Sequence, residues 1–549
     1  MRKSIVLIAF GFFFLSPCLL WAQEIPRYLV LFSNKSNSPF STTSPEAFLS
    51  PRAIERRARQ GISITTSDLP VNPGYTEAVR QTGAKVLFTS RWLNAALLEA
   101  TDSQLTAIKA LPFFKSIERD LPLATSQTAG IGRLGAVQQK FGTQETIDHG
   151  RMLTQLNLLG IPQIHEKGIR GKGILIAVLD AGFSRGNEVQ YIRHLFDNKQ
   201  IIDTYDFISR ESDVFDDHFH GLNCLSTIAA NQPGTMVGAA FEADFALYRS
   251  ENEYSETPYE EATWLMAAER ADSVGADILS CSLGYNQFDN PIYDYSYADM
   301  DGKTALVTRA AQQAARTGML VVNAAGNSGN DPWKFITAPA DADSILTVGA
   351  TFSNRSYAPF SSVGPTADGR LKPDVAAMGA GTVIGNNLGL GTVSTGSGTS
   401  FATPQIAGFA ALLWQAYPFL RTQELIQIIR RAGHQAANPD NLLGFGVPTI
   451  QIAEETIQTE YTPLGLEPSL VEHIEIYPNP VEDYVSLHFG PVSTMALLQL
   501  YTPTGTMVQS HALTTVPTVQ IPVSALPAGT YILKITMNKE IKALKFLKH

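Results

Sequence analysis

Apolar positions in the middle of the chain gather in short, nearly continuous runs. From residue 171 onward, segments that are typical of helices separate the runs GILIAVLD, FALYRS, ADILSCSLG and MLVVNAAGN. Strands that are apolar on both faces are buried on both faces, which indicates a mostly parallel sheet covered by helices. The pattern therefore predicts an α/β domain over residues 151–455. Ligands of such sheets bind at the carboxyl ends of the strands, where Asp180, Ser282 and Asn327 fall.

A second pattern, in TGSGTSFATPQIAGFAALLWQAYP at residues 395–418, changes from small polar residues to a long apolar run. Proline is tolerated in the first turn of a helix, and apolar residues follow Pro404 at helical spacing. The segment predicts a largely buried helix over residues 400–416, with Ser400 at its N-terminus. A hydroxyl in that position ordinarily caps free backbone N–H groups, so this pattern alone assigns no chemistry to Ser400.

Smaller patterns flank the central domain. Strand patterns in RYLVLFS and KVLFTSRWLNAALLEA lie on either side of the helix-capable stretch SPEAFLSPRAIERRARQGI. They predict a small α+β domain over residues 23–120, which a turn-rich connection over 121–150 follows. A polar, proline-bearing linker is predicted over 456–473. Strand patterns separated by turn signals then predict a small all-β sandwich over 474–549.

Composition and the N-terminus narrow the class of protein. The chain of 549 residues, 44% of them hydrophobic, has the length of about two to four globular domains. A net charge of -10 without a basic cluster argues against nucleic-acid binding as the main task. Residues 1–22 combine basic residues, an apolar stretch and a small residue at Ala22, which is typical of a signal peptide cleaved after Ala22. No later segment reaches the ~18 apolar residues of a membrane span, so we expect an exported protein.

The cysteines say little about stability. Removal of the signal peptide leaves Cys224 and Cys281, which is too few for a disulfide scaffold. The sequence leaves open whether these two residues pair. Cys18 is a candidate for lipidation, but Pro17 occupies the place of the small residue that lipidation requires, so cleavage after Ala22 is favoured.

Three segments together carry residues for nucleophilic catalysis. Asp180 ends a strand in VLDAGF, His220 begins a small-residue helix in HGLNCLSTIAA, and Ser400 begins another helix in GTSFATP. A serine becomes a nucleophile when a histidine takes its proton and a carboxylate holds that histidine in the right tautomer. The G-x-S-x-G elbow of the α/β-hydrolases is absent, because Gly398 and Ala402 stand two residues before and after Ser400.

These segments resemble the signature blocks of the subtilisin-like serine proteases, in which acid, base and nucleophile follow in this order. Asp180 matches the acid of the D-[ST]-G block, His220 the base of the H-G-T block, and Ser400 the nucleophile of G-T-S-M-A-T-P. In NAAGN, Asn327 matches the asparagine that binds the oxyanion together with the backbone N–H of the nucleophile. The resemblance implies a secreted serine endopeptidase that works through an acyl-enzyme intermediate.

The resemblance also implies the walls of a substrate pocket. In the family, the P1 side chain, which precedes the cleaved bond, lies between two backbone segments, and the substrate adds as an extended strand. The matching residues here are Ser282, Leu283 and Gly284 in one wall and Ala324, Ala325 and Gly326 in the other. Taken without the resemblance, both segments are strand ends with tight turns. The P1 preference itself does not follow from the sequence.

Three residues depart from the family blocks. Ala181 replaces serine or threonine, Leu222 replaces threonine, and Phe401 replaces methionine. Leu222 and Phe401 keep open an alternative function, a catalytically inactive subtilisin fold that is retained for binding. An esterase that uses the same triad is a further alternative. Phe401 has no explanation in the sequence.

We expect no catalytic metal and no cofactor. His218, Asp216 and Asp217 precede a helix, where carboxylates complement the helix dipole, and His218 is expected to be exposed. Cys224 follows His220 by one helical turn and is expected to be a core residue. The acidic stretch at 294–303 lacks a full ligand loop, so a structural calcium ion stays open without an assigned site.

The flanking domains carry resemblances of their own. The unit at 23–120 resembles the inhibitory propeptides of subtilisin-like zymogens, with an ordinary N-terminal domain as the alternative. The unit at 474–549 resembles the sorting domains of type IX secretion, through YPNP, GTYILKI and the closing KFLKH. An adhesion or carbohydrate-binding sandwich is the alternative. The expected partners are protein or peptide substrates and the type IX secretion machinery, and the mature protein is expected to be monomeric. It would be secreted, or held at the cell surface, by a bacterium with an outer membrane.

Overall fold

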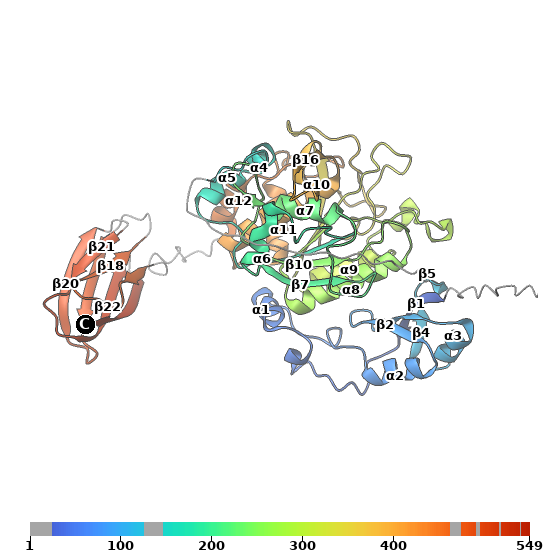
Figure 1. Cartoon of the computed structure of the whole chain (residues 1–549), viewed down its shortest axis with the longest axis horizontal. Coiled ribbons are helices and arrows are strands. Elements are labelled where there is room, and N and C mark those ends of the chain that lie inside the picture. The colour runs from blue at the N-terminus through green and yellow to red at the C-terminus, as the bar shows by residue number, and fades with distance from the viewer. Residues whose placement is uncertain (1–24, 126–146, 462–473, 490–494, 515–517, 538–539) are drawn as a thin grey trace, which may run out of the picture. The chain divides into compact units, whose positions relative to one another are not determined.

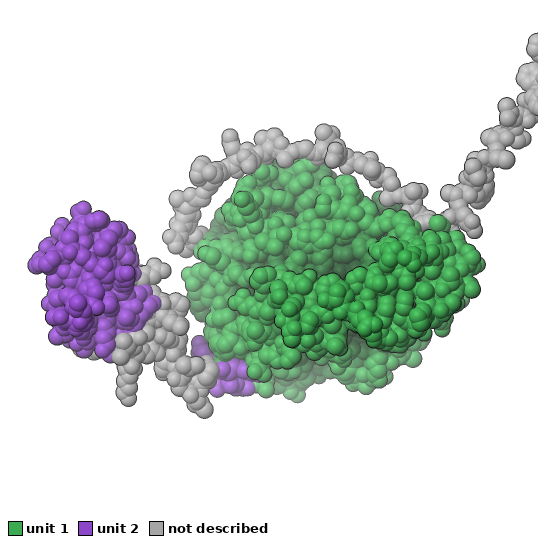
Figure 2. Space-filling model, turned by 90° about the horizontal axis from the view of Figure 1, so that it is seen from below, with its two compact units in different colours: residues 1–457 green, residues 458–549 purple. Residues whose placement is uncertain are grey.

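The structure is a computed structural model of the whole chain. It describes residues 25–125, 147–461, 474–489, 495–514, 518–537 and 540–549. Contacts divide the chain into two compact units, residues 1–457 and 458–549 (Figure 2). The signal peptide predicted over 1–22 lies outside the described residues, as do large parts of the connections predicted over 121–150 and 456–473. The domain boundaries therefore stay predictions. No helix within the described ranges is long and apolar enough to cross a membrane.

The first unit is built on a seven-stranded sheet, parallel throughout, in the order β14-β13-β12-β11-β6-β10-β7 (Figure 1). Its strands are β6 (Leu175–Asp180), β7 (Ile201–Asp206), β10 (Asp244–Arg249), β11 (Ile278–Cys281), β12 (Leu320–Ala324), β13 (Leu346–Thr351) and β14 (Val375–Met378). The apolar runs of the sequence form β6, β10, β11 and β12, which are almost entirely buried. This confirms the predicted parallel sheet. β10 and β11 flank β6 on opposite sides, so a crevice opens at the carboxyl end of β6.

Helices cover both faces of this sheet (Figure 1). α7 and α10 pack together on one face, and α8 and α9 pack together on the other. The helices are α4 (Leu153–Leu159), α5 (Ile161–Glu166), α6 (Arg193–Asp197), α7 (His220–Ala229), α8 (Tyr259–Val274), α9 (Leu306–Arg316), α10 (Thr399–Ala416), α11 (Thr422–Arg431) and α12 (Ile450–Thr456). α10 begins one residue before the predicted start, and it is buried on every side because it is apolar on every side. Short antiparallel pairs are β8 (Asn231–Gln232) with β9 (Met236–Val237) and β15 (Thr382–Gly385) with β16 (Val393–Gly396).

Residues 26–125 form the α+β domain that the sequence predicts. Its antiparallel sheet has the order β2-β3-β1-β4, and β5 pairs with β1. The elements are β1 (Pro26–Phe32), α1 (Pro51–Gln60), α2 (Pro73–Gln81), β2 (Lys85–Ser90), β3 (Ala95–Glu99), α3 (Asp102–Lys109), β4 (Phe114–Ile117) and β5 (Ala124–Thr125). α2 has no counterpart among the predicted elements. It begins where the Asn72 side chain caps Gly74 N and Pro73 takes the first helical position.

A buried cluster of charges joins this α+β domain to α8. Asp272 of α8 accepts hydrogen bonds from Arg56, Arg57 and Arg91, and all four side chains are buried. Burial acts to raise the pKa of Asp272, but the three guanidinium groups lower it below its ordinary value. Removing one partner from such a cluster would leave an uncompensated buried charge. The contact between the α+β domain and α8 therefore depends on all four residues.

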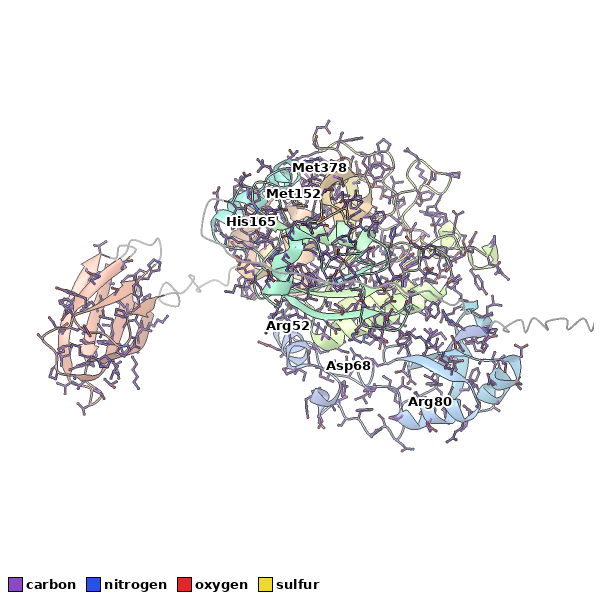
Figure 3. The ribbon with its side chains drawn as sticks, viewed as in Figure 1. Arg52, Asp68, Arg80, Met152, His165 and Met378 are labelled. Carbon is purple, nitrogen blue, oxygen red and sulfur yellow. The ribbon has the colours of Figure 1, made fainter. Side chains whose placement is uncertain are left out.

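Further ion pairs surround this cluster. Arg52 and Arg59 of α1 both bind Asp277, which precedes β11, and Arg119 lies 3.0 Å from Glu261 of α8. Figure 3 shows Arg52 on the side of α1 that is turned toward the central sheet. The α+β domain therefore packs against α8 and α9, which cover one face of the central sheet.

The second unit is a β-sandwich, as predicted. Its two antiparallel sheets have the orders β17-β18-β21 and β20-β19-β22-β23. The strands are β17 (Glu475–Tyr477), β18 (Tyr484–His488), β19 (Met495–Tyr501), β20 (Met507–Thr514), β21 (Thr518–Pro522), β22 (Gly529–Met537) and β23 (Glu540–Lys548). Leu487 of one sheet and Leu498 and Leu533 of the other belong to one buried core, and more exposed residues flank Leu498 and Leu533 along their strands.

Candidate active site

Four polar residues reach one edge of the central sheet from the ends of its elements. Asp180 is the last residue of β6, and Asn327 follows the end of β12. His220 is the first residue of α7, and Ser400 is the second residue of α10. The carboxyl ends of the strands and the N-termini of the two helices therefore meet at the crevice beside β6.

Asp180 and His220 form a close pair. Asp180 Oδ1 lies 2.7 Å from His220 Nδ1 and also accepts the Ala181 N–H at 2.8 Å. A Cβ on Gly221 would meet Gly182 O at 2.5 Å, so only glycine lets α7 approach the end of β6 this closely. Burial of the ring acts to lower the pKa of His220, but the Asp180 carboxylate outweighs it and raises that pKa well above 6.5. Nδ1 is thus committed to Asp180, which leaves Nε2 for another partner.

The Ser400 hydroxyl faces the first pocket wall. Its Oγ donates to the Ser282 carbonyl at 3.3 Å, and the residue is 7% exposed. In the described part of the chain, no hydrogen bond joins this hydroxyl to His220. A rotation of the Ser400 side chain is therefore needed before the two groups can exchange a proton.

The start of α10 is capped by an amide oxygen from a distant loop. The N-cap residue is Gly398, and none of the hydroxyls of its own segment caps the helix. Instead, Asn327 Oδ1 accepts the Thr399 N–H at 2.8 Å and the Thr399 hydroxyl at 3.1 Å. A Cβ on Gly398 would lie 3.7 Å from both Asn327 Nδ2 and Ser400 N, so these two donors border the same space. A helix N-terminus with two donors around one open space is suited to binding a negative oxygen.

A pocket of about 140 Å³ adjoins Ser400 between the two predicted walls. It is lined by Ser282, Leu283, Gly284, Asn286, Ala324, Gly326, Asn327, Ser328, Thr337, Thr399 and Ser400. Ala325 was predicted with the second wall, and it is fully buried and does not line the pocket. Sequence reasoning missed Asn286, Ser328 and Thr337, because they lie in loops without a periodic pattern or a family block.

Cys224 and Phe401 pack around His220. Cys224 Sγ lies 3.9 Å from His220 Nδ1 and donates to the Ser400 carbonyl at 3.4 Å, and burial raises the pKa of this thiol. The Phe401 ring lies 5.8 Å from the His220 ring and shares a buried cluster with Cys224 and Ile384. Phe401 therefore has a structural role, since its ring packs against the His220 ring at an angle of 39°. Cys224 and Cys281 are both buried and free.

The structure corrects the expectation that His218 is exposed. His218 is half-buried, and its Nε2 lies 2.7 Å from Glu253 Oε2 because the loop after β10 folds back over it. Asp217 was expected to complement the dipole of α7, and the structure shows in addition an ion pair with Arg249 at 2.9 Å. Burial and neighbouring carboxylates raise the pKa of Asp217 to about 7, against the opposing effect of Arg249.

Within the described ranges, two groups of side chains place their ligand atoms close enough together to hold a metal ion. They are Asp180 with His220 and Cys224, and Glu251 with Glu256 and Glu260. In the second group, Glu260 already accepts the N–H groups of Asn252 and Thr257, and Glu251 accepts the Tyr285 hydroxyl. The carboxylates at 294–303 accept N–H groups of their own loop: Asp294 from Phe288, Asp299 from Ser296 and Asp301 from Lys303 and Thr304.

Comparison with protein families identifies three segments of the chain. Residues 171–446 match the subtilase family, which is about half of the chain. Residues 27–131 match the peptidase S8 propeptide domain of Bacteroidota. Residues 475–549 match a secretion system C-terminal sorting domain. The three matches follow the order of the α+β domain, the parallel sheet and the sandwich.

Individual relatives match the central part. Serine protease AprX of Bacillus subtilis (strain 168) is 29% identical over 306 residues, which are 51% of this chain and 65% of AprX. Subtilisin DY of Bacillus licheniformis is 26% identical over 310 residues, which are 56% of this chain and 98% of that protein. The chain thus spans just under two thirds of AprX and nearly all of subtilisin DY.

Solved structures also resemble this chain. A protease of Pseudoalteromonas arctica PAMC 21717 aligns with a TM-score of 0.45 and 22% identity, over 57% of this chain and 99% of its own. The MycP3 protease of the type VII (ESX-3) secretion system aligns with a TM-score of 0.46 and 22% identity, over 56% of this chain and 89% of its own.

Proposed function

The chain belongs to the subtilase family, and from this premise we propose that it is a secreted serine endopeptidase with Ser400 as nucleophile. The observation that carries the proposal is the edge of the sheet at β6. There Cys224 contacts both His220 Nδ1 and the Ser400 carbonyl, so the Asp180–His220 pair lies beside Ser400. Ser400 and Asn327 line one pocket, and the donors Asn327 Nδ2 and Ser400 N border the same space. A fold that only binds a partner would not require a histidine held by a buried carboxylate beside two N–H donors that border one space.

The proposed reaction starts when the Ser400 hydroxyl turns toward His220. Its Oγ attacks the substrate carbonyl while its proton passes to His220 Nε2. Asp180 holds Nδ1 and stabilises the imidazolium that forms. The carbonyl oxygen becomes negative and is bound by Asn327 Nδ2 and Ser400 N. His220 then gives the proton to the leaving amine, which yields an acyl-enzyme, and water repeats the sequence to release the acid.

The α+β domain is proposed to be an inhibitory propeptide. It matches a propeptide family, and it holds α8 through the buried Asp272 cluster and the surrounding pairs. Arg56 and Arg57 come from α1, whereas Arg91 directly follows β2, so the three residues reach Asp272 together only when the domain is folded. Unfolding or cleavage of this domain would expose Asp272 and release the central domain. The C-terminal sandwich is proposed to direct export by type IX secretion machinery and to be removed afterwards.

A fluorophosphonate probe tests the nucleophile directly. The processed protein should form an adduct on Ser400 and hydrolyse peptides, and Ser400→Ala should do neither and should retain the propeptide. Absence of an adduct in processed protein would overturn the proposal that the chain is an enzyme and would favour the inactive binding fold. Hydrolysis of ester substrates without peptide substrates would instead favour an esterase that uses the same residues.

A further inference from the structure

The pocket beside Ser400 is lined without a charged side chain among the described residues. Its polar lining consists of hydroxyl and amide groups, from Ser282, Asn286, Asn327, Ser328, Thr337, Thr399 and Ser400. Burying a charged side chain without a partner costs far more than burying an uncharged one. The lining therefore favours uncharged P1 residues.

Thr337 belongs to a segment that bridges the two walls. Its backbone N–H donates to the Ala325 carbonyl of the second wall at 3.3 Å. The next residue, Ala338, pairs in both directions with Tyr285, which directly follows the first wall, at 3.1 and 2.8 Å. Backbone hydrogen bonds thus fix Thr337 to both walls, and its side chain has little freedom to move away.

The Thr337 hydroxyl fills the gap between these walls. A Cβ on Gly284 would lie 2.2 Å from Thr337 Oγ1, and a Cβ on Gly326 would lie 3.1 Å from it. Thr337 is 4% exposed, and its Oγ1 has no hydrogen-bond partner among the described residues. The hydroxyl fits between the walls only because both positions are glycine. It therefore closes the space between the walls and forms the bottom of the pocket, which we call its floor.

We propose that Thr337 limits the depth of the pocket and so restricts P1 to small, uncharged side chains such as alanine and serine. This inference rests on the proposed peptidase function. A cavity of about 150 Å³ holds one benzene molecule. The pocket of about 140 Å³ must also hold the scissile peptide group beside Ser400 and Asn327, so an aromatic P1 ring does not fit above Thr337. Charged P1 side chains would find no partner there.

Quenched peptides that differ only at P1 test this assignment with the processed enzyme. The natural enzyme should cleave after alanine with a kcat/KM at least about tenfold above that for phenylalanine, and arginine should be the poorest P1 residue. Thr337→Gly should raise the phenylalanine-to-alanine ratio by about tenfold or more, because the floor is removed. Thr337→Val keeps the shape of the side chain, so it should retain the selectivity of the natural enzyme.

A matched control comes from Thr351, whose hydroxyl is also buried without a partner among the described residues but lies outside the pocket lining. Thr351→Val should leave the P1 ratio unchanged. Should Thr337→Gly yield no folded enzyme, Thr337→Ala replaces it, and a smaller gain for phenylalanine is expected. Equal cleavage after phenylalanine and alanine by the natural enzyme, or an unchanged ratio in the glycine or alanine variant, would overturn the proposal. If one of these results is found and the fluorophosphonate probe still labels Ser400, only the assignment of Thr337 fails and the peptidase function stands. If the processed protein shows neither the adduct nor any cleavage, the peptidase function itself is refuted.

Discussion

His220 with Asp180 and His218 with Glu253 form two histidine–carboxylate pairs at the same edge of the sheet. In each pair a ring nitrogen lies 2.7 Å from a carboxylate oxygen. The two rings are nearly parallel, at 13° with their centroids 6.4 Å apart. By distance alone, neither pair stands out as the one that would serve a nucleophile.

The pairs differ in burial and in the nitrogen that remains. The Asp180 carboxylate is 0% exposed at the end of β6, whereas the Glu253 side chain is 28% exposed on a loop. His220 keeps Nε2 for the cleft, but His218 uses Nε2 for Glu253 and retains a buried Nδ1 without a partner in the described part of the chain. A proton acceptor must face the reacting group. Only the Asp180–His220 pair therefore combines a fully buried carboxylate with an Nε2 that the carboxylate does not occupy.

The electrostatic settings differ in the same sense. The buried carboxylate raises the pKa of His220 well above 6.5 despite desolvation of the ring. For His218, desolvation is the larger effect and lowers the pKa, while Glu253 opposes it and His220 adds to it. Because the pKa of His218 is lowered and that of His220 is raised, His220 is the ring that takes up a proton first.

Replacing the two histidines in turn gives the largest expected contrast. His220→Ala should lower kcat by roughly 10⁶-fold, a magnitude known from subtilisin itself, because the proton acceptor is lost. His218→Ala should cost less than about tenfold. Turnover of a peptide substrate checks this after an added protease has removed the propeptide from both variants. Comparable losses would show that the second pair takes part in the chemistry.

The two carboxylates should differ nearly as much. Asp180→Asn preserves shape but stabilises the wrong tautomer of His220, so kcat should fall by about 10⁴-fold. Glu253→Gln should change kcat by less than about fivefold, because an ion pair with a partially exposed carboxylate contributes at most about 1 kcal/mol. Steady-state kinetics of both variants at one pH measures the difference. A large loss in Glu253→Gln would assign the loop carboxylate to the triad.

The pH dependence of activity separates the pairs more finely. His220 must be neutral to accept a proton, so kcat/KM should fall as pH decreases through its raised pKa, with a midpoint above 6.5. Asp180→Asn removes the negative charge and should move this midpoint to lower pH. His218→Gln should leave the midpoint in place. A midpoint that follows the His218 substitution would mean that the wrong histidine has been assigned to proton transfer.

The sequence predicts one of these pairs and not the other, for a physical reason. Asp180 and His220 stand at the ends of a strand and a helix with strong apolar patterns, and at such ends parallel sheets gather their functional groups. Glu253 and Thr337 lie in loops, where position depends on contacts with segments far along the chain. Ser400 shows the same limit, because its helix is capped by Asn327 and not by a neighbouring hydroxyl.

Phe401 offers the smallest test, since its ring contacts the His220 ring. Phe401→Met restores the residue typical of the family and nearly conserves volume, so stability should change by less than about 1.5 kcal/mol. Because the Phe401 ring packs against the His220 ring, kcat should fall by a factor of about two to five while KM stays constant. Phe401→Ala, the matched control, opens a cavity and should destabilise the domain by about 3–5 kcal/mol. Kinetics and denaturant unfolding of both variants separate the two effects. An unchanged kcat in Phe401→Met would show that Asp180 and α7 orient the ring without help, which would leave burial of the carboxylate and the ring nitrogen it binds as the structural differences between the two pairs.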